Sequence, residues 1–238
     1  MTAPGSLLGG RVRHEQLPDG HRTGIEPVLL AASIPARAGQ RVLEAGSGAG
    51  AALLCLAWRV PRISGLGVER EAALAALARE NAEVNGFAGL SFAAQALEDW
   101  ADVEKFDHAF ANPPWHAPGT ESPDRRREAA RRARPGLFAD WTQRLAAALR
   151  PRGTLTLVVA ADHFTECLAA LDAAGCGGLS VLPLWPKAGR AARLVLLRGI
   201  KGSRATDRLL PGLVLHAAQS GYTAEATAIL REGAPLAF

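Results

Sequence analysis

The sequence predicts an α/β fold with a doubly wound, mostly parallel seven-stranded sheet that ends in a C-terminal antiparallel hairpin. Short apolar runs bounded by turn residues alternate with helix-like segments along most of the 238 residues, which is typical of consecutive βαβ units. The last two apolar runs are separated by only PKAGRA, and a parallel crossover needs a dozen or more residues, so these two are expected to pair as a hairpin. The chain length suits one domain of this kind.

The expected strands are short and end at Gly, Pro or polar residues. In chain order they are RVLEA (41–45), ISGLGVE (63–69), LSFAA (90–94), DHAFA (107–111), GTLTLVVA (153–160), LSVLPLW (179–185) and ARLVLLR (192–198). The remaining tail is expected to hold a loop, one short strand and a helix that begins at Thr223.

Helices are expected between these strands, where Ala, Leu, Glu and Arg recur and a breaker follows. The first is LLAASIP, closed by Pro35, and the helix after the second strand stops at Asn85-Gly86. Three more are AALLCLAWRV (51–60), LFADWTQRLAAALR (137–150) and DHFTECLAALDAAG (162–175).

The composition excludes several classes of protein. With 48% hydrophobic and 21% charged residues the chain can build a core, which argues against global disorder. No apolar run approaches the ~20 residues of a membrane span, and the N-terminus lacks the features of a signal peptide, so we expect a cytoplasmic protein. The three cysteines form no CxxC pair and the six histidines show no ligand spacing, so neither a disulfide framework nor a metal site is expected.

The net charge of +4 comes from a basic set of 24 Arg and 3 Lys. Six arginines fall within RRREAARRAR (125–134), and seven Lys or Arg fall within 187–208 against the single Asp207. Clustered guanidinium groups favour phosphate, which predicts a nucleic-acid contact, although a solvated helix face is the alternative interpretation.

A glycine-rich turn follows the first strand, in VLEAGSGAG. Glu44 ends the strand, and Gly46, Gly48 and Gly50 alternate into a helix, where glycines permit positive φ and the helix start offers free N–H groups. The spacing GxGxG differs from the GxGxxG of dinucleotide sites, although a nicotinamide cofactor stays open as the second possibility. Glu69 ends the second strand, where an acid can accept both ribose hydroxyls of an adenosyl group.

The fourth strand leads into Asn112-Pro113-Pro114-Trp115. Two prolines lock the backbone and remove two amide donors, so the turn presents acceptors. The Asn112 side chain and the Pro113 carbonyl can both accept from an exocyclic NH₂, while Trp115 can stack on a flat heterocycle. A rigid turn with an exposed Trp is the structural alternative.

These motifs resemble those of known families. ExGxGxG resembles the first motif of class I methyltransferases, which have a Rossmann-like fold and bind S-adenosylmethionine, and the NPPW turn resembles the [DN]-P-P-[YFW] motif of methyltransferases that act on planar amine or amide nitrogens. The segments DGHRTGIEPVLLA (19–31), GTESPDRRREAA (119–130) and VLPLWPKAGRAARLVLLRGIKGSR (181–204) resemble the bacterial tRNA1(Val) adenine-37 N6-methyltransferases. This similarity covers nearly the whole chain, from Leu8 to the C-terminal helix.

The resemblance implies a transferase that methylates the exocyclic N6 of an adenine in RNA, with tRNA as partner, S-adenosylmethionine as cofactor and no metal. It divides the domain into a substrate- and cofactor-covering segment (1–35), a catalytic core (36–200) and a C-terminal extension (201–238). The implied catalytic residues are Asn112, Pro113, Pro114 and Trp115. The implied cofactor-binding residues are Arg22, Thr23, Gly24, Glu44, Gly46, Ser47, Gly48, Gly50, Glu69, Arg70, Gln95, Ala96 and Asn112. The expected RNA-binding residues are Arg125, Arg126, Arg127, Arg131, Arg132, Lys187, Arg190, Lys201 and Arg204.

The sequence departs from the family pattern at several positions. His21 stands where Tyr is usual, Glu26 where Asp is usual, and Trp115 replaces the commoner Tyr or Phe. Gln95 occupies the place of an acid that contacts the cofactor adenine, with Asp99 as a second candidate.

Two other functions stay open. Methylation of a protein glutamine at N5 suits the NPP turn, but the extra N-terminal substrate domain usual in those enzymes is not found before Leu8. A non-catalytic RNA-binding protein that retains the cofactor fold is the other possibility, and the complete set of motifs counts against it.

Overall fold

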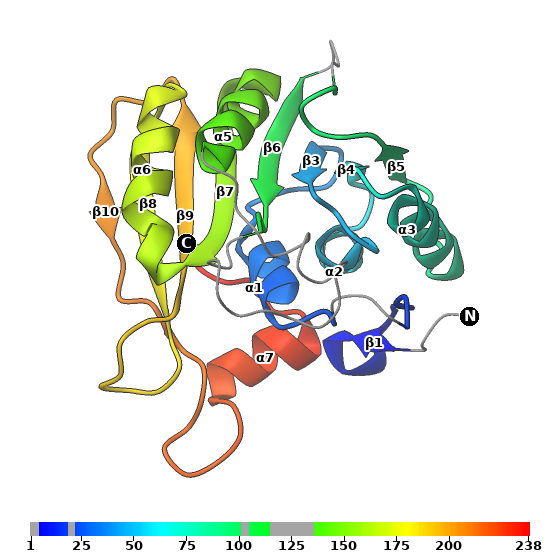
Figure 1. The fold of residues 1–238 in the computed structure, drawn as a ribbon. Helices are drawn as coiled ribbons and strands as arrows, with labels where there is room; N and C mark the ends of the chain where they lie inside the picture. The colour runs from blue at the N-terminus through cyan, green and yellow to red at the C-terminus, as the bar shows by residue number, and fades with distance from the viewer. Residues whose placement is uncertain (1–4, 19–21, 101–104, 115–135) are drawn as a thin grey trace.

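A mixed β-sheet with helices on both faces forms the centre of the computed structural model, which describes residues 5–18, 22–100, 105–114 and 136–238 (Figure 1). The strand order is β10-β8-β9-β7-β6-β3-β4-β5, with β11 also paired to β8. The strands of this sheet are β3 (Arg41–Ala45), β4 (Ser64–Glu69), β5 (Leu90–Ala94), β6 (Phe106–Ala111), β7 (Leu149–Ala160), β8 (Cys176–Trp185), β9 (Leu194–Lys201), β10 (Arg208–Leu209) and β11 (Leu213–Val214). A separate antiparallel hairpin consists of β1 (Ser6–Leu7) and β2 (Val12–Arg13).

The sheet confirms the predicted doubly wound topology. The chain moves outward from β3 through β4 to β5 and then returns to β6 on the other side of β3, with all these pairings parallel. β9 lies between β7 and β8 and is antiparallel to both, which confirms the predicted hairpin. The order reverses between β3 and β6, and in open α/β sheets ligands bind at the carboxyl ends of the strands at such a switch point.

Helices pack on both faces of the sheet and enclose two apolar clusters. One cluster lies under α1, α2, α3 and α7, and the other lies under α5 and α6. Because strand side chains alternate, Val42 joins the first cluster and its neighbour Leu43 joins the second. The helices are α1 (Glu26–Ser33), α2 (Ala51–Arg59), α3 (Ala72–Val84), α5 (Leu137–Ala148), α6 (Phe164–Ala173) and α7 (Ala224–Glu232), with short 3₁₀ turns η1 (Leu8–Gly10) and η2 (Ala161–His163).

The predicted long strands and helices are all present, with boundaries that differ by a few residues. The tail forms two short strands, β10 and β11, rather than the one expected, because Pro211 and Gly212 interrupt the segment that runs beside β8. The predicted start of the last helix is confirmed by Thr223, whose hydroxyl caps α7 by accepting from Ala226 N. The β1–β2 hairpin was not predicted.

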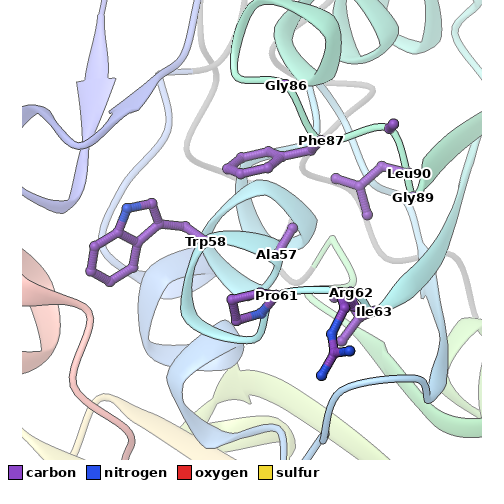
Figure 2. A pocket seen from close by; sticks show the side chains of 10 residues that line it. Ala57, Trp58, Pro61, Arg62, Ile63, Gly86, Phe87, Gly89 and Leu90 are labelled. Carbon is purple, nitrogen blue, oxygen red and sulfur yellow. The ribbon is translucent and has the colours of Figure 1, made fainter.

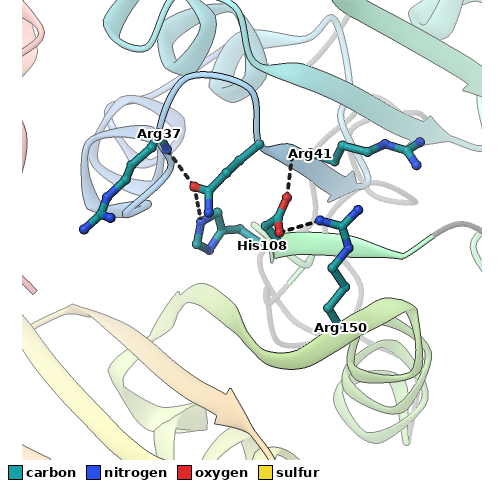
Figure 3. Close-up of polar contacts among 6 residues, drawn as sticks. Arg37, Arg41, His108 and Arg150 are labelled. Carbon is teal, nitrogen blue, oxygen red and sulfur yellow. Dashed lines mark hydrogen bonds and ion pairs between the residues drawn. The ribbon is translucent and has the colours of Figure 1, made fainter.

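A polar network joins β3, β6 and β7 at their amino ends (Figure 3). The Asp107 carboxylate accepts from Arg41 N at 2.8 Å and from Arg150 Nη1 at 2.7 Å. The buried His108 ring lies between Thr154 Oγ1 and the Gln40 Oε1 acceptor, so it carries its proton on Nε2. Burial lowers the pKa of His108 to about 4, which keeps the ring neutral.

No helix in the described ranges is long and apolar enough to cross a membrane. Within the same ranges no cluster of three or more metal-ligating side chains occurs.

Candidate functional site

Four predicted groups meet at the carboxyl edge of the sheet. β3, β4, β5 and β6 are parallel neighbours, and their last residues pair across the strands, for example Ala45 with Ala111 and Glu69 with Ala94. The glycine turn, Glu69, Gln95 and Asn112 stand at or directly after these strand ends. The fold thus brings together groups that are separated by up to 66 positions in sequence, from Gly46 to Asn112.

The glycine turn adopts backbone conformations that require glycine. Gly46, Gly48 and Gly50 have φ of 65°, 54° and 90°, and the last of these precedes the first residue of α2. Gly46 N donates to Val68 O at 2.8 Å, and Gly50 N donates to Ser47 O at 2.8 Å. The turn therefore stays close to β4, and the start of α2 lies at the same edge.

Glu69 ties the turn to the end of β4. Its side chain is 7% exposed, and its carboxylate accepts from Gly48 N at 2.8 Å and from Glu71 N at 2.9 Å. Each carboxylate oxygen can accept a second hydrogen bond, so both can still receive hydroxyl groups of a ligand.

Glu44 is a buried carboxylate behind the turn. It is 4% exposed and accepts from Leu53 N, in the first turn of α2, at 3.2 Å. Burial raises the pKa of Glu44 well above its ordinary value, the Leu53 hydrogen bond opposes this, and the nearby charge of Glu69 adds to it. A ligand with positive charge would stabilise the ionised form of Glu44, which fits the ammonium and sulfonium groups of S-adenosylmethionine.

Gln95 lies next to Glu69 at the end of β5. Its backbone N–H donates to Glu69 O at 2.9 Å, and its side-chain Nε2 donates to Asp99 O at 2.7 Å. This contact leaves the Oε1 carbonyl of Gln95 to accept from an amine. Asp99 itself is exposed, as is Arg70, while Ala96 is half-buried and begins the turn that includes Asp99.

Asn112 follows β6 at the centre of the edge. Its side-chain Oδ1 is buried and accepts no hydrogen bond from any described residue. Pro113 is buried and Pro114 is half-buried, and neither has an N–H group. A buried carbonyl oxygen without a donor is costly, so this acceptor is suited to a ligand N–H group. Trp115 lies outside the described residues.

Trp141 belongs to the site and was not predicted. It comes from α5, and its ring lies so close to the glycine turn that a Cβ on Gly46 would stand 2.8 Å from Trp141 Cη2. The Trp141 Nε1 atom is buried and donates to no described residue. The sequence shows only an aromatic residue within an amphipathic helix, which gives no sign that it reaches the turn.

The segment before α1 also faces this edge. Arg59, at the end of α2, donates to Ala31 O and Ile34 O at the end of α1, so the two helices run parallel and begin at the same edge. Of the three predicted cofactor residues here, Arg22 and Gly24 are exposed and Thr23 is half-buried, with Thr23 N bound to the Gln16 side chain at 2.8 Å.

The predicted basic residues do not all reach this edge. Lys187 and Arg190 are exposed in the β8–β9 turn, which lies at the carboxyl edge because β8 is parallel to β7. Lys201 pairs with Cys176 at the start of β8, so Lys201 and Arg204 lie at the opposite edge of the sheet. These two predicted RNA-binding residues therefore stand apart from the candidate site. The residues Arg125, Arg126, Arg127, Arg131 and Arg132 lie outside the described residues.

A hollow lies at the opposite, amino edge of the sheet. Its volume is about 330 Å³, and it lies between the end of α2 and the start of β5, beside Trp58, Pro61, Arg62 and Phe87 (Figure 2). None of the predicted site residues lines it. Its position at the amino ends of the strands separates it from the switch point, so it is not the candidate catalytic site.

The strand order, the glycine turn and the acids at the ends of β3 and β4 define a class I S-adenosylmethionine-dependent methyltransferase, and S-adenosylmethionine is its cofactor. The family model of the methyltransferase small domain matches residues 25–172, and the chain belongs to that family.

Similar proteins cover most of the chain. A tRNA1(Val) (adenine(37)-N6)-methyltransferase of Actinobacillus succinogenes is 29% identical over 218 residues, 89% of each protein, and one of Aeromonas hydrophila is 30% identical over 208 residues, 85% of each. Among solved structures, a predicted O-methyltransferase of Agrobacterium tumefaciens superposes with a TM-score of 0.74 and 26% identity, covering 90% of this chain and 99% of that one.

Proposed function

We propose that this methyltransferase transfers a methyl group to the exocyclic N6 of an adenine in RNA, with tRNA as its substrate. The observation that carries the proposal is the acceptor turn after β6. Asn112 Oδ1 is buried without a donor among the described residues, and it lies at the same sheet edge as the glycine turn. An amine that donates two hydrogen bonds, one to Asn112 Oδ1 and one to Pro113 O, satisfies this turn.

The two acceptors also account for the chemistry. Hydrogen bonds from the NH₂ group to Asn112 and Pro113 draw the nitrogen lone pair out of ring conjugation and orient it for in-line attack. When bound, S-adenosylmethionine would supply the sulfonium methyl group as electrophile, and S-adenosylhomocysteine would leave with the electron pair of the broken C–S bond. No strong general base is required, because the nitrogen becomes acidic once methylated and loses its proton. Orientation of this kind can contribute roughly 7–11 kcal/mol.

The residues that we assign to the cofactor lie at the same edge of the sheet. We assign Glu44 and the turn at Gly46–Gly50 to the amino-acid portion of the cofactor, Glu69 to the ribose hydroxyls and Gln95 Oε1 to the adenine amine. Burial of Glu44 and Glu69 beside the glycine turn and the start of α2 supports this assignment. Arg70, Ala96 and the segment 22–24 are assigned to the rim of the same site.

The RNA assignment is supported by charge at the site edge and by the names of the relatives, which act on tRNA. Lys187 and Arg190 lie three strands from Asn112 at the same edge, where they can contact phosphates. We also propose the three-part division of the domain, in which residues 1–35 cover the site, because the N-terminal segment contacts the glycine turn through Asn81.

The test is incubation with methyl-labelled S-adenosylmethionine and, separately, bulk tRNA that lacks the modification, release-factor protein, or buffer. The proposal predicts label in RNA alone, and its loss in Asn112→Ala while cofactor binding persists. Label in the protein fraction would favour glutamine methylation, and cofactor binding without transfer to any substrate would favour the non-catalytic alternative. Either result would overturn the proposal.

A further inference from the structure

A groove opens at the carboxyl edge between the β8–β9 turn and β11. Its volume is about 540 Å³, which is enough for one nucleotide, and its lining is formed by Trp185, Ala188, Gly189, Arg190, Ala191 and Val214. Three of the lining residues, Ala188, Gly189 and Ala191, are small, and the Trp185 side chain itself lines the groove. No residue assigned to the cofactor lines it.

Trp185 is held in one orientation. Its Nε1 donates to Pro211 O at 3.0 Å, and the backbone of Gly212 lies so close that a Cβ there would stand 2.5 Å from Nε1. Gly212 has a φ of 87°, which a residue with a side chain rarely adopts. The polar edge of the ring is thus already satisfied and fixed, and Trp185, half-buried, presents a rigid aromatic surface to the groove.

The β8–β9 turn beside Trp185 carries positive charge. Lys187, Arg190 and Arg193 are exposed in the turn, and the turn is fixed to the rest of the protein by two contacts. Lys187 Nζ donates to Ala218 O at 3.4 Å, and Ala161 N donates to Arg193 O at 2.9 Å. An aromatic surface beside guanidinium groups is the combination that binds single-stranded nucleic acid, through base stacking and phosphate contact.

The groove lies within reach of the methyl-transfer site. β8, β9, β7 and β6 are successive neighbours in the sheet, so three spacings of ~4.8 Å place Trp185 and Asn112 on strands about 14 Å apart. Both residues stand at carboxyl ends of parallel strands. An RNA strand with its adenine at Asn112 spans this distance within a few nucleotides.

We propose that this groove binds a nucleotide next to the target adenine, with Trp185 stacked on its base and Arg190 in contact with its phosphate. The inference rests on the proposed function, because it requires an RNA substrate. The charge of the turn favours a polyanionic strand over an apolar peptide.

The test compares Trp185→Leu, Trp185→Phe and Arg190→Ala with Arg37→Ala, which removes an exposed arginine at the opposite edge (Figure 3). Affinity for an unmodified tRNA transcript is measured over a range of KCl concentrations, together with the KM for RNA and the Kd for S-adenosylmethionine. The cofactor Kd verifies that each variant is folded.

Trp185→Leu should weaken RNA binding at least about fivefold with little change in salt dependence, and Trp185→Phe should retain most of the affinity. Arg190→Ala should reduce the slope of log Kd against log salt concentration by about 0.7 to 0.9. Arg37→Ala should leave the RNA affinity and its salt dependence near those of the wild-type protein.

Two results would overturn the inference. If the wild-type protein methylates RNA but neither Trp185→Leu nor Arg190→Ala changes the affinity or the KM for RNA, the groove inference fails and the proposed function stands. If methyl label instead enters protein, and Trp185→Leu raises the KM for that protein, both fail and the groove binds a peptide.

Discussion

Asn81 offers a test of how the N-terminal segment supports the cofactor turn. This residue of α3 is 2% exposed, and its side chain makes three hydrogen bonds. Nδ2 donates to Ala49 O at 3.0 Å and to Glu15 O at 3.1 Å, while Oδ1 accepts from Glu15 N at 2.9 Å. One buried amide therefore joins the glycine turn to the N-terminal segment.

Asn85, one helical turn later, is a matched control. It also makes three hydrogen bonds, to Arg13 N, Arg13 O and Asn81 O, but none to the glycine turn. Each substitution to Ala removes hydrogen bonds to the N-terminal segment, but only Asn81→Ala also removes a hydrogen bond to the glycine turn.

The expected magnitudes follow from the hydrogen bonds lost. At about 1 kcal/mol for each bond, Asn81→Ala should lower the free energy of unfolding by about 3 kcal/mol. If the bond to Ala49 O keeps the turn in its binding conformation, its loss should weaken S-adenosylmethionine binding by about fivefold. Asn85→Ala should leave cofactor affinity within about twofold.

The assays are urea unfolding for stability and isothermal titration for cofactor affinity, at a temperature where both variants are folded. Equal effects of the two substitutions on cofactor affinity, or an unchanged affinity in Asn81→Ala, would refute the proposed link between Asn81 and the turn.

Three further predictions concern Glu44, the glycine turn and two buried histidines. Burial raises the pKa of Glu44, which means that its ionised form destabilises the folded protein, so Glu44→Gln should maintain or raise the urea midpoint of the cofactor-free protein at pH 8. The same substitution should weaken cofactor binding about tenfold. Equal cofactor affinity would argue against the assigned contact. Gly46→Ala should lower the free energy of unfolding by about 1–2 kcal/mol, because Gly46 has a φ of 65°. Its new methyl group should also clash with Trp141 and weaken cofactor binding, and adding Trp141→Leu should partly restore the affinity. Unchanged cofactor affinity in Gly46→Ala alone would contradict this prediction. Burial lowers the pKa of His14 and of His108 from 6.5 to about 4, so the unfolded chain takes up protons first and each ring costs about 2 kcal/mol of stability at pH 5 relative to pH 8. Protonation of Glu44 in the folded protein opposes this loss, so the loss is measured in the Glu44→Gln background. It should be halved when His108→Gln is added, and a urea midpoint equal at both pH values would be inconsistent with it.

Local sequence signals predicted the parts of the molecule that depend on neighbouring residues. The strands at 41–45 and 90–94 match β3 and β5 at both ends, because each is a short apolar run between turn residues. The grouping of Glu69, Gln95 and Asn112 was also predictable, since residues that follow parallel strands share one edge.

Contacts between distant segments were not predictable in this way. Trp141 and Asn81 each sit on an ordinary amphipathic helix, and only the packing of that helix brings them to the glycine turn. The position of Lys201 and Arg204 away from the site could have been predicted. The predicted hairpin already placed the strand 192–198, seven residues and about 23 Å long, between them and Arg190, so their position at the opposite edge follows from the topology.

The most direct test of the account is the identity of the methylated nucleoside. Unmodified tRNA is incubated with the protein and with S-adenosylmethionine that carries a deuterated methyl group, digested to nucleosides and analysed by mass spectrometry. The account predicts deuterated N6-methyladenosine with the unmodified protein and none with Asn112→Ala. A deuterated methyl group on any other nucleoside or on a ribose oxygen, or equal N6-methyladenosine from Asn112→Ala, would contradict it.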